Sequence, residues 1–100
     1  MENQPLSGTK KLPVEIPSSQ RVEILLFAAA AEKAGAARVS LEVPPQATIA
    51  QVSEALRQRW PQLAELLAIS RWAVNRRFVS ADTQLGRGDE IALIPPVSGG

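Results

Sequence analysis

The spacing of apolar residues changes along this 100-residue chain, and the change limits the folds that the chain can adopt. Between residues 38 and 43, Val39, Leu41 and Val43 alternate with polar or charged residues, which is typical of a β-strand buried on one face. Between residues 48 and 63 the apolar residues recur every three or four positions, which predicts an amphipathic helix. These residues are Ile49, Val52, Leu56, Trp60 and Leu63. One main helix among short strands predicts an α+β domain, with the helix packed over one face of the sheet.

The main helix has recognisable ends. Thr48 can cap its N-terminus with the side-chain hydroxyl. Pro61 ends or kinks the helix, and proline also suits the first turn of a short second helix. In that second helix we expect Leu63, Leu66 and Leu67 to face the core.

The other elements are short and are separated by glycine, proline or asparagine. Residues 21–27 turn from alternating to continuously apolar, which favours a central strand buried on both faces. Residues 28–34 are alanine-rich and predict a small helix, which Gly35 can end. Three further strands are expected at residues 72–74, 77–79 and 90–94, with turns at 75–76 and 86–89.

The two ends of the chain differ from the expected domain, which spans residues 20–94. Residues 1–19 contain prolines, serines and lysines but no periodic apolar pattern, so we expect a flexible extension. Residues 95–100 form a separate tail. From Ile91 to Gly100 no side chain is ionisable, and the only charge there is the terminal carboxylate.

The composition of this tail suits insertion into another protein. Pro95 and Pro96 hold the stem extended, because each fixes φ and removes an N–H group. Gly99 and Gly100 have no Cβ, so the tip is thin. Six residues could reach roughly 20 Å beyond the domain. The alternative is an inert, frayed terminus.

The residue types that are missing exclude several kinds of site. The chain has no cysteine and no histidine, which disfavours a disulfide framework, a metalloenzyme and a self-contained hydrolase. A formal net charge of +1 gives no strong field for nucleic acid. No apolar run approaches 18 residues and no signal-peptide pattern is present, so we expect a cytoplasmic protein. Six arginines form either a solvated surface or a docking face: Arg57, Arg59, Arg71, Arg76, Arg77 and Arg87.

The order of elements, with Gly-Gly after the final strand, resembles the ubiquitin-like β-grasp sulfur carriers, above all the small subunits of molybdopterin synthase. The stretches that carry the resemblance are residues 22–28, 73–75, 88–92 and 94–100. It covers roughly residues 20–100 and leaves the N-terminal extension outside. One departure is Ile94, where members of the family often carry an aromatic residue, and this bears on docking and not on the chemistry.

The resemblance implies a β-grasp fold and a role as the sulfur-donor subunit of a sulfurtransferase. An ATP-dependent adenylating enzyme would convert the carboxylate of Gly100, next to Gly99, into an acyl-adenylate and then a thiocarboxylate. The large subunit would take up the tail in a heterotetramer and supply the catalytic side chains, and sulfur would pass to cyclic pyranopterin monophosphate. The implied contacts with the large subunit are Phe27, Ile94, Pro95, Pro96, Val97 and Ser98. No bound cofactor or metal is implied, and neither nucleic acid nor a membrane is an expected partner.

Other functions and other roles for single residues stay open at this point. The chain could be a sulfur carrier for thiamine biosynthesis, a ubiquitin-like modifier joined to lysines, or an interaction module. Phe27 is either a core residue or a contact with the large subunit, and Trp72 is either core or partly exposed at an interface. Trp60 is expected in the core. Asn75 is expected in a turn with positive φ, and Asp89 is expected to cap a turn and not to bind a ligand.

Overall fold

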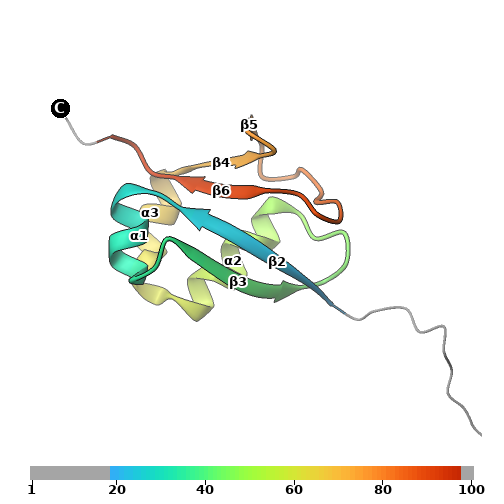
Figure 1. Ribbon diagram of the computed structural model, residues 1–100, viewed down its shortest axis with the longest axis horizontal. Coiled ribbons are helices and arrows are strands. Elements are labelled where there is room, and N and C mark those ends of the chain that lie inside the picture. The colour runs from blue at the N-terminus through green and yellow to red at the C-terminus, as the bar shows by residue number, and fades with distance from the viewer. Residues whose placement is uncertain (1–18, 98–100) are drawn as a thin grey trace, which may run out of the picture.

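The computed structural model describes residues 19–97, which form a five-stranded mixed sheet packed against helices (Figure 1). In chain order the elements are β2 (Gln20–Leu26), α1 (Ala28–Ala34), β3 (Arg38–Val43), α2 (Ile49–Arg59), the 3₁₀ turn η1 (Pro61–Leu63), α3 (Ala64–Ile69), β4 (Arg71–Val74), β5 (Arg77–Val79) and β6 (Ile91–Ile94). The expected α+β arrangement and the expected order of elements are therefore confirmed.

The sheet has the strand order β3-β2-β6-β4-β5. The first and last of these strands along the chain, β2 and β6, lie side by side and parallel in the middle of the sheet. On either side of this pair, β3 runs antiparallel to β2 and β4 runs antiparallel to β6, while β5 completes a hairpin with β4. Because β6 lies between two partners, the segment after it starts from the interior of the sheet and not from an edge.

The ends of α2 follow the sequence signals. The Thr48 hydroxyl accepts a hydrogen bond from the Gln51 N–H (3.3 Å), and the Thr48 N–H donates to Gln51 Oε1 (2.8 Å), which is a complete capping box. Pro61 begins η1, and α3 follows directly. The small helix α1 ends at Gly35, whose φ of 77° is the left-handed conformation that glycine adopts without steric cost.

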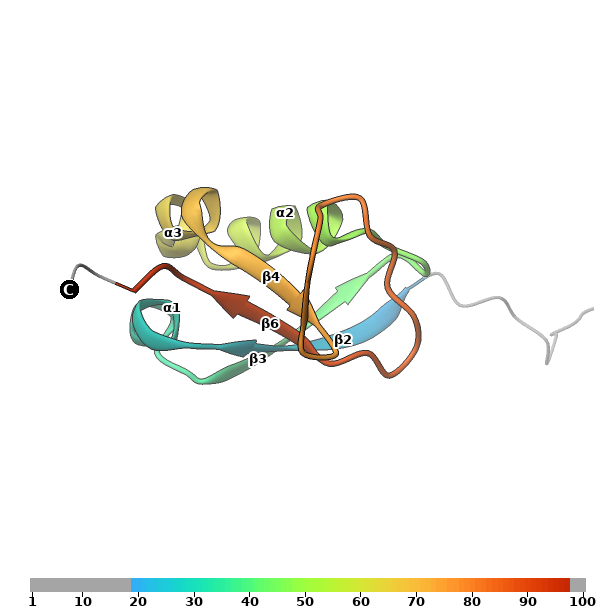
Figure 2. The same cartoon turned by 90° about the horizontal axis from the view of Figure 1, so that it is seen from above.

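The core lies between the helices and one face of the sheet. Figure 2 shows α2 and α3 together on that side. The largest side chains with essentially no exposed surface are Ile24, Ile49, Val52, Leu56, Leu63, Ile91 and Leu93. Leu66, Leu67 and Trp60 pack against this core and are only partly buried. None of the described helices is long and apolar enough to cross a membrane.

The expectation for β2 was wrong on one point. Val22, Ile24 and Leu26 are buried, but Arg21 and Glu23 are exposed. Leu25 is half-buried. The physical reason is that no helix among residues 19–97 covers the second face of the sheet, so β2 is central in the sheet without being buried on both faces (Figure 2).

Candidate functional site

The C-terminal segment leaves the domain directly from the central strand β6. Pro95 is buried and Pro96 is exposed, so the chain separates from the body between the two prolines. Proline has no N–H to donate, which explains why the ladder of β6 with its neighbours stops at Ile94. Val97 is 93% exposed. Figure 1 shows this end of the chain pointing away from the sheet. Ser98, Gly99 and Gly100 lie outside the described residues.

An apolar depression lies on the uncovered face of the sheet. It has a volume of about 340 Å³. Its lining residues are Leu25, Phe27, Ala73, Phe78, Ala92 and Ile94, with Arg76 and Glu90 beside them. We call this depression the outer hollow. Because Ile94 both lines the outer hollow and precedes Pro95, the hollow lies next to the point where the tail begins.

The register of four strands produces the outer hollow. Leu25 of β2 lies opposite Ala92 of β6, Ala92 lies opposite Ala73 of β4, and Ala73 lies opposite Phe78 of β5. Two alanines therefore occupy the middle of this row, with larger side chains on both sides. Phe27 is 48% exposed and Phe78 is 53% exposed. Two half-exposed aromatic rings beside a depression are typical of a protein-protein contact surface.

Charged groups stand at the rim of the outer hollow. The guanidinium carbon of Arg71 lies 3.7 Å from the centroid of the Phe78 ring, a cation–π contact that holds the ring in place. Arg76 Nε lies 3.6 Å from Glu90 Oε1, and both side chains are largely exposed. Such a surface ion pair adds little to stability, but it places one positive and one negative group beside an apolar patch.

A network of hydrogen bonds fixes the turns that carry this rim. Asn75 and Arg76 both have positive φ, 53° and 69°, as a two-residue hairpin turn requires. The Asn75 side-chain amide donates to Asp89 Oδ1 (3.0 Å), and Asn75 Oδ1 accepts from the Glu90 N–H (3.0 Å). Asp89 Oδ2 accepts from the Gly86 N–H (2.6 Å). The expected roles of Asn75 and Asp89 in turns are confirmed, and the bond that ties the two turns together was not expected.

The structure separates the alternatives for the aromatic residues. Phe27 does not lie in the core, because it occupies the corner between β2 and α1, where Ala28 has a positive φ of 51°. Trp72 is only 8% exposed, so the interface alternative for Trp72 is wrong. The outer hollow brings Phe27 and Ile94 together and adds residues that were not predicted, namely Leu25, Ala73, Phe78 and Ala92.

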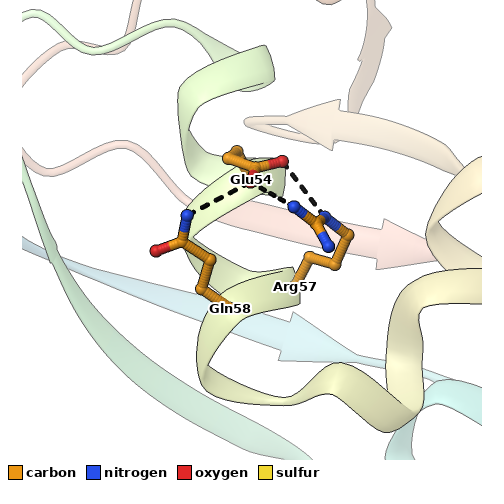
Figure 3. Close-up of polar contacts among 3 residues, drawn as sticks. All are labelled: Glu54, Arg57 and Gln58. Atoms are coloured by element: carbon orange, nitrogen blue, oxygen red, sulfur yellow. Dashed lines mark hydrogen bonds and ion pairs between the residues drawn. The ribbon is translucent and has the colours of Figure 1, made fainter.

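Most of the clustered arginines contact a partner within the chain. On α2, Arg57 donates two hydrogen bonds to the carboxylate of Glu54, one of them from Nε at 3.1 Å, and Gln58 Nε2 donates a third at 3.2 Å (Figure 3). These bonds, led by those from Arg57, lower the pKa of Glu54. Arg59 lies over the ring of Trp60 at 5.2 Å. A docking role for these arginines stays a prediction.

The described part of the chain offers an apolar surface and no cluster of metal ligands. Within residues 19–97 no group of three or more aspartate, glutamate, histidine or cysteine side chains could hold a metal ion. What the described residues supply is an apolar surface beside the segment that leaves β6, an arrangement suited to docking.

Comparison with known proteins identifies the family. A family model described as the ThiS family matches residues 24–100. The chain belongs to the ThiS family. Two relatives are named molybdopterin synthase sulfur carrier subunit. The protein from Dictyostelium discoideum is 36% identical over 85 residues, covering 82% of this chain and 99% of the relative. The human protein is 37% identical over 83 residues, covering 80% and 94%.

Solved structures establish the ubiquitin-like β-grasp fold of this ThiS-family chain. SAMP1 from Haloferax volcanii superimposes with a TM-score of 0.73 at 31% identity, covering 81% of this chain and all of that one. A second structure is a protein-protein complex of subunits 1 and 2 of molybdopterin-converting factor from Helicobacter pylori. Its matching chain gives a TM-score of 0.57 at 27% identity, covering 81% of this chain and all of that one.

The family match and the structural site coincide. The match begins at residue 24, so it includes every residue that lines the outer hollow as well as the whole tail. Residues 1–23, which contain the N-terminal extension and the first part of β2, lie outside the match. The outer hollow and the tail thus both lie within the residues that the ThiS-family model matches.

Proposed function

We propose that this chain is the sulfur carrier subunit of a molybdopterin synthase. The observation that carries the proposal is the departure of an uncharged tail from the central strand β6 beside the outer hollow, in a chain whose relatives bear that name. In this function Gly100 carries the transferred sulfur as a C-terminal thiocarboxylate. The acceptor is cyclic pyranopterin monophosphate, and the product serves molybdenum cofactor biosynthesis.

The chemistry requires activation of the terminal carboxylate. A carboxylate is a poor acyl donor, so an adenylating enzyme first joins it to the AMP part of ATP and releases pyrophosphate. Sulfide (HS⁻) then attacks the terminal carbonyl carbon of Gly100. The new C–S bond replaces the C–O bond to AMP, AMP leaves, and the product is a thiocarboxylate. Sulfur in this ionised form is a soft nucleophile at neutral pH. We also place the reaction in the cytoplasm, where the ATP that activation consumes is available.

The outer hollow gives the large subunit a surface to recognise. Phe27 and Ile94 offer apolar contacts, while Pro95, Pro96 and Val97 lead from that surface toward the partner's active site. Five residues from Pro96 to the terminus could extend roughly 17 Å, enough to enter a pocket that the domain itself cannot enter. A partner cation would stabilise the anionic thiocarboxylate there. The Helicobacter pylori complex supports a second subunit as the partner.

The test is reconstitution from purified components. The full chain is incubated with the adenylating enzyme, ATP and a sulfur donor, and intact-mass spectrometry should show one oxygen replaced by sulfur at Gly100. Addition of the large subunit and cyclic pyranopterin monophosphate should then return the carrier to its carboxylate form and yield molybdopterin. A carrier that gains sulfur but gives none to this acceptor, while supporting thiamine biosynthesis, contradicts the proposal.

A second function is favoured by one comparison. SAMP1 from Haloferax volcanii, whose other structure is titled small archaeal modifier protein 1, has the same fold at 31% and 29% identity in the two structures. A modifier forms an amide bond between its terminal glycine and a lysine of another protein. Tryptic digests of source cells distinguish the two functions. Because Arg87 is the last trypsin site of the chain, a modifier would leave the segment 88–100 attached to lysines of other proteins, and the sulfur carrier would not.

A further inference from the structure

The strand β3 forms one edge of the sheet and has no neighbouring strand on its outer side among residues 19–97 (Figure 1). It is six residues long, whereas β5 at the opposite edge has three. Within β3 there is no proline that would block pairing with a further strand. An edge of this length is a ready template for an added strand.

The hydrogen-bond phase shows which backbone groups are available on that edge. The Leu26 N–H donates to the Ala37 carbonyl (2.8 Å), which defines the bonded pairs in the antiparallel ladder of β2 and β3. Bonded pairs alternate along such a ladder, so Val39 and Leu41 direct their backbone groups toward β2. The intervening residues, Arg38, Ser40 and Glu42, therefore direct theirs toward the open side.

A groove of about 590 Å³ runs along this edge. Its floor and walls come from β3, the neighbouring Arg21, and the C-terminal end of α2, where Arg59 and Trp60 lie. We call it the edge groove. Trp60 is half-buried and packs against the core, with the Arg59 guanidinium above its ring. The groove therefore combines an open strand edge with an apolar aromatic wall.

The charges around the edge groove favour an acidic ligand. Three arginines line it, namely Arg21, Arg38 and Arg59, against one lining carboxylate, that of Glu42. Arg38 also lies 3.4 Å from Glu23, and Glu42 accepts a hydrogen bond from the Ser19 hydroxyl at 3.0 Å. The Arg38–Glu23 contact is exposed and weak, so the Arg38 guanidinium stays accessible to a ligand.

We propose that the edge groove binds an extended acidic peptide segment of another protein, which pairs with β3 as an added outer strand. The Ser40 N–H and carbonyl, the Arg38 carbonyl and the Glu42 N–H would form the new ladder. Alternate apolar side chains of the peptide would pack toward Trp60, and its carboxylates, on the opposite face of the added strand, would face Arg21 and Arg38. The edge groove shares no lining residue with the outer hollow, so this contact does not depend on the sulfur-carrier function.

The test uses the full chain and a short synthetic peptide in which valine alternates with aspartate. A matched peptide has lysine in place of aspartate, and a second control carries N-methyl groups on the peptide bonds that would pair. We expect the acidic peptide to slow amide exchange of Ser40 and Glu42 by about tenfold or more. The indole N–H signal of Trp60 should shift, and that of the buried Trp72 should not. Both control peptides should bind at least roughly tenfold more weakly.

Two variants separate the proposed contact from general effects. Ser40→Pro removes an N–H that faces the groove and that the sheet does not use, so it should abolish binding. If that variant does not fold, the double variant Arg21→Glu and Arg38→Glu should still weaken binding by about tenfold or more. Arg77→Glu, a charge reversal on the opposite edge strand, is the matched control and should leave the affinity unchanged.

Four results would overturn the proposal. The first is equal affinity of the acidic and the lysine peptide. The second is that the NMR signals shifted by the peptide belong to residues around the outer hollow. The third is protection of the β3 amides that rises with protein concentration in the absence of peptide, which would mean that a second copy occupies the edge. The fourth is protection of the β3 amides that is independent of protein concentration and is lost when residues 1–18 are removed. That result would mean that the chain's own N-terminal segment occupies the edge.

Discussion

The two faces of the sheet differ in what their side chains contact, although successive residues of one strand point to opposite faces. On the covered face, Ile91 and Leu93 of β6 have no exposed surface. On the other face, Ala92 and Ile94 line the outer hollow. Neighbouring positions of one strand thus divide between holding the fold and presenting a surface. Substitutions at adjacent residues should therefore separate stability from function.

The largest expected effect concerns the tail, which belongs to neither face. Deletion of Gly99 and Gly100 should abolish sulfur transfer, because it removes the carbonyl that carries the sulfur. The free energy of unfolding should stay nearly unchanged, since the chain leaves the body at Pro96. Transfer is measured with the reconstituted large subunit, and unfolding by urea titration. A substantial loss of stability would mean that the tail packs against the domain.

Substitutions on the covered face of the sheet should lower the stability of the fold. Leu93→Ala should lower the free energy of unfolding by about 2–5 kcal/mol, because it leaves a cavity where the side chain has no exposed surface. Urea denaturation followed by far-ultraviolet circular dichroism measures the change. The matched variant Ile94→Ala, one residue further on, should cost clearly less. Equal losses of unfolding free energy at the two positions would contradict the difference between the two faces.

Substitutions on the outer face of the sheet should weaken binding to the large subunit. Aspartate at Phe27, Ile94 or Val97 should weaken association with the large subunit by about 2 kcal/mol or more at any position that is a buried hot spot. Folding should be preserved, since Phe27 and Val97 are 48% and 93% exposed and Ile94 is half-buried. Calorimetric titration of each folded variant gives the affinity. Unchanged affinity for all three would remove the outer hollow as the contact surface and leave the role of Gly100 intact.

The smallest expected effect lies on the solvent side of α2, away from both faces of the sheet. Hydrogen bonds from Arg57 lower the pKa of Glu54 below the ordinary value of 4.5. A lowered pKa in the folded state adds stability above the unfolded value, and this stability is lost as the pH falls through the folded pKa. The wild type should therefore lose slightly more stability than Glu54→Gln on acidification below pH 4.5. Urea midpoints measured across this range test the difference, and parallel curves would contradict it.

Local signals were sufficient to predict the order of elements. Thr48, Pro61 and Gly35 act on their own neighbours through a side-chain cap, a fixed φ and a left-handed φ. Their effects are therefore visible in a short stretch of sequence. The outer hollow could not be predicted in this way, because it depends on Ala73 lying beside Ala92 and Phe78. Those pairings are set by the strand order across the whole sheet.

The misjudged burial of β2 has a related cause. Leu25 is apolar, so the run from residue 24 to residue 27 looks like a strand buried on both sides. In the structure Leu25 and Phe27 belong to the outer hollow, where apolar residues face a surface and not the core. A pattern of apolar residues alone does not distinguish a second layer of the fold from a surface that a partner covers.

The position of β6 between β2 and β4 also affects the kinetics of delivery. A tail that follows an edge strand could detach together with that strand. The tail of this chain follows β6, which is hydrogen-bonded to a strand on each side. Once a partner binds the outer hollow, the start of the tail has a fixed position relative to that partner. The terminal glycine can then reach only points within roughly 17 Å of this position. The effective concentration of the terminal glycine at a pocket within that radius is then in the millimolar range, as for a short tether. Insertion becomes an intramolecular step whose rate does not depend on how much carrier is present.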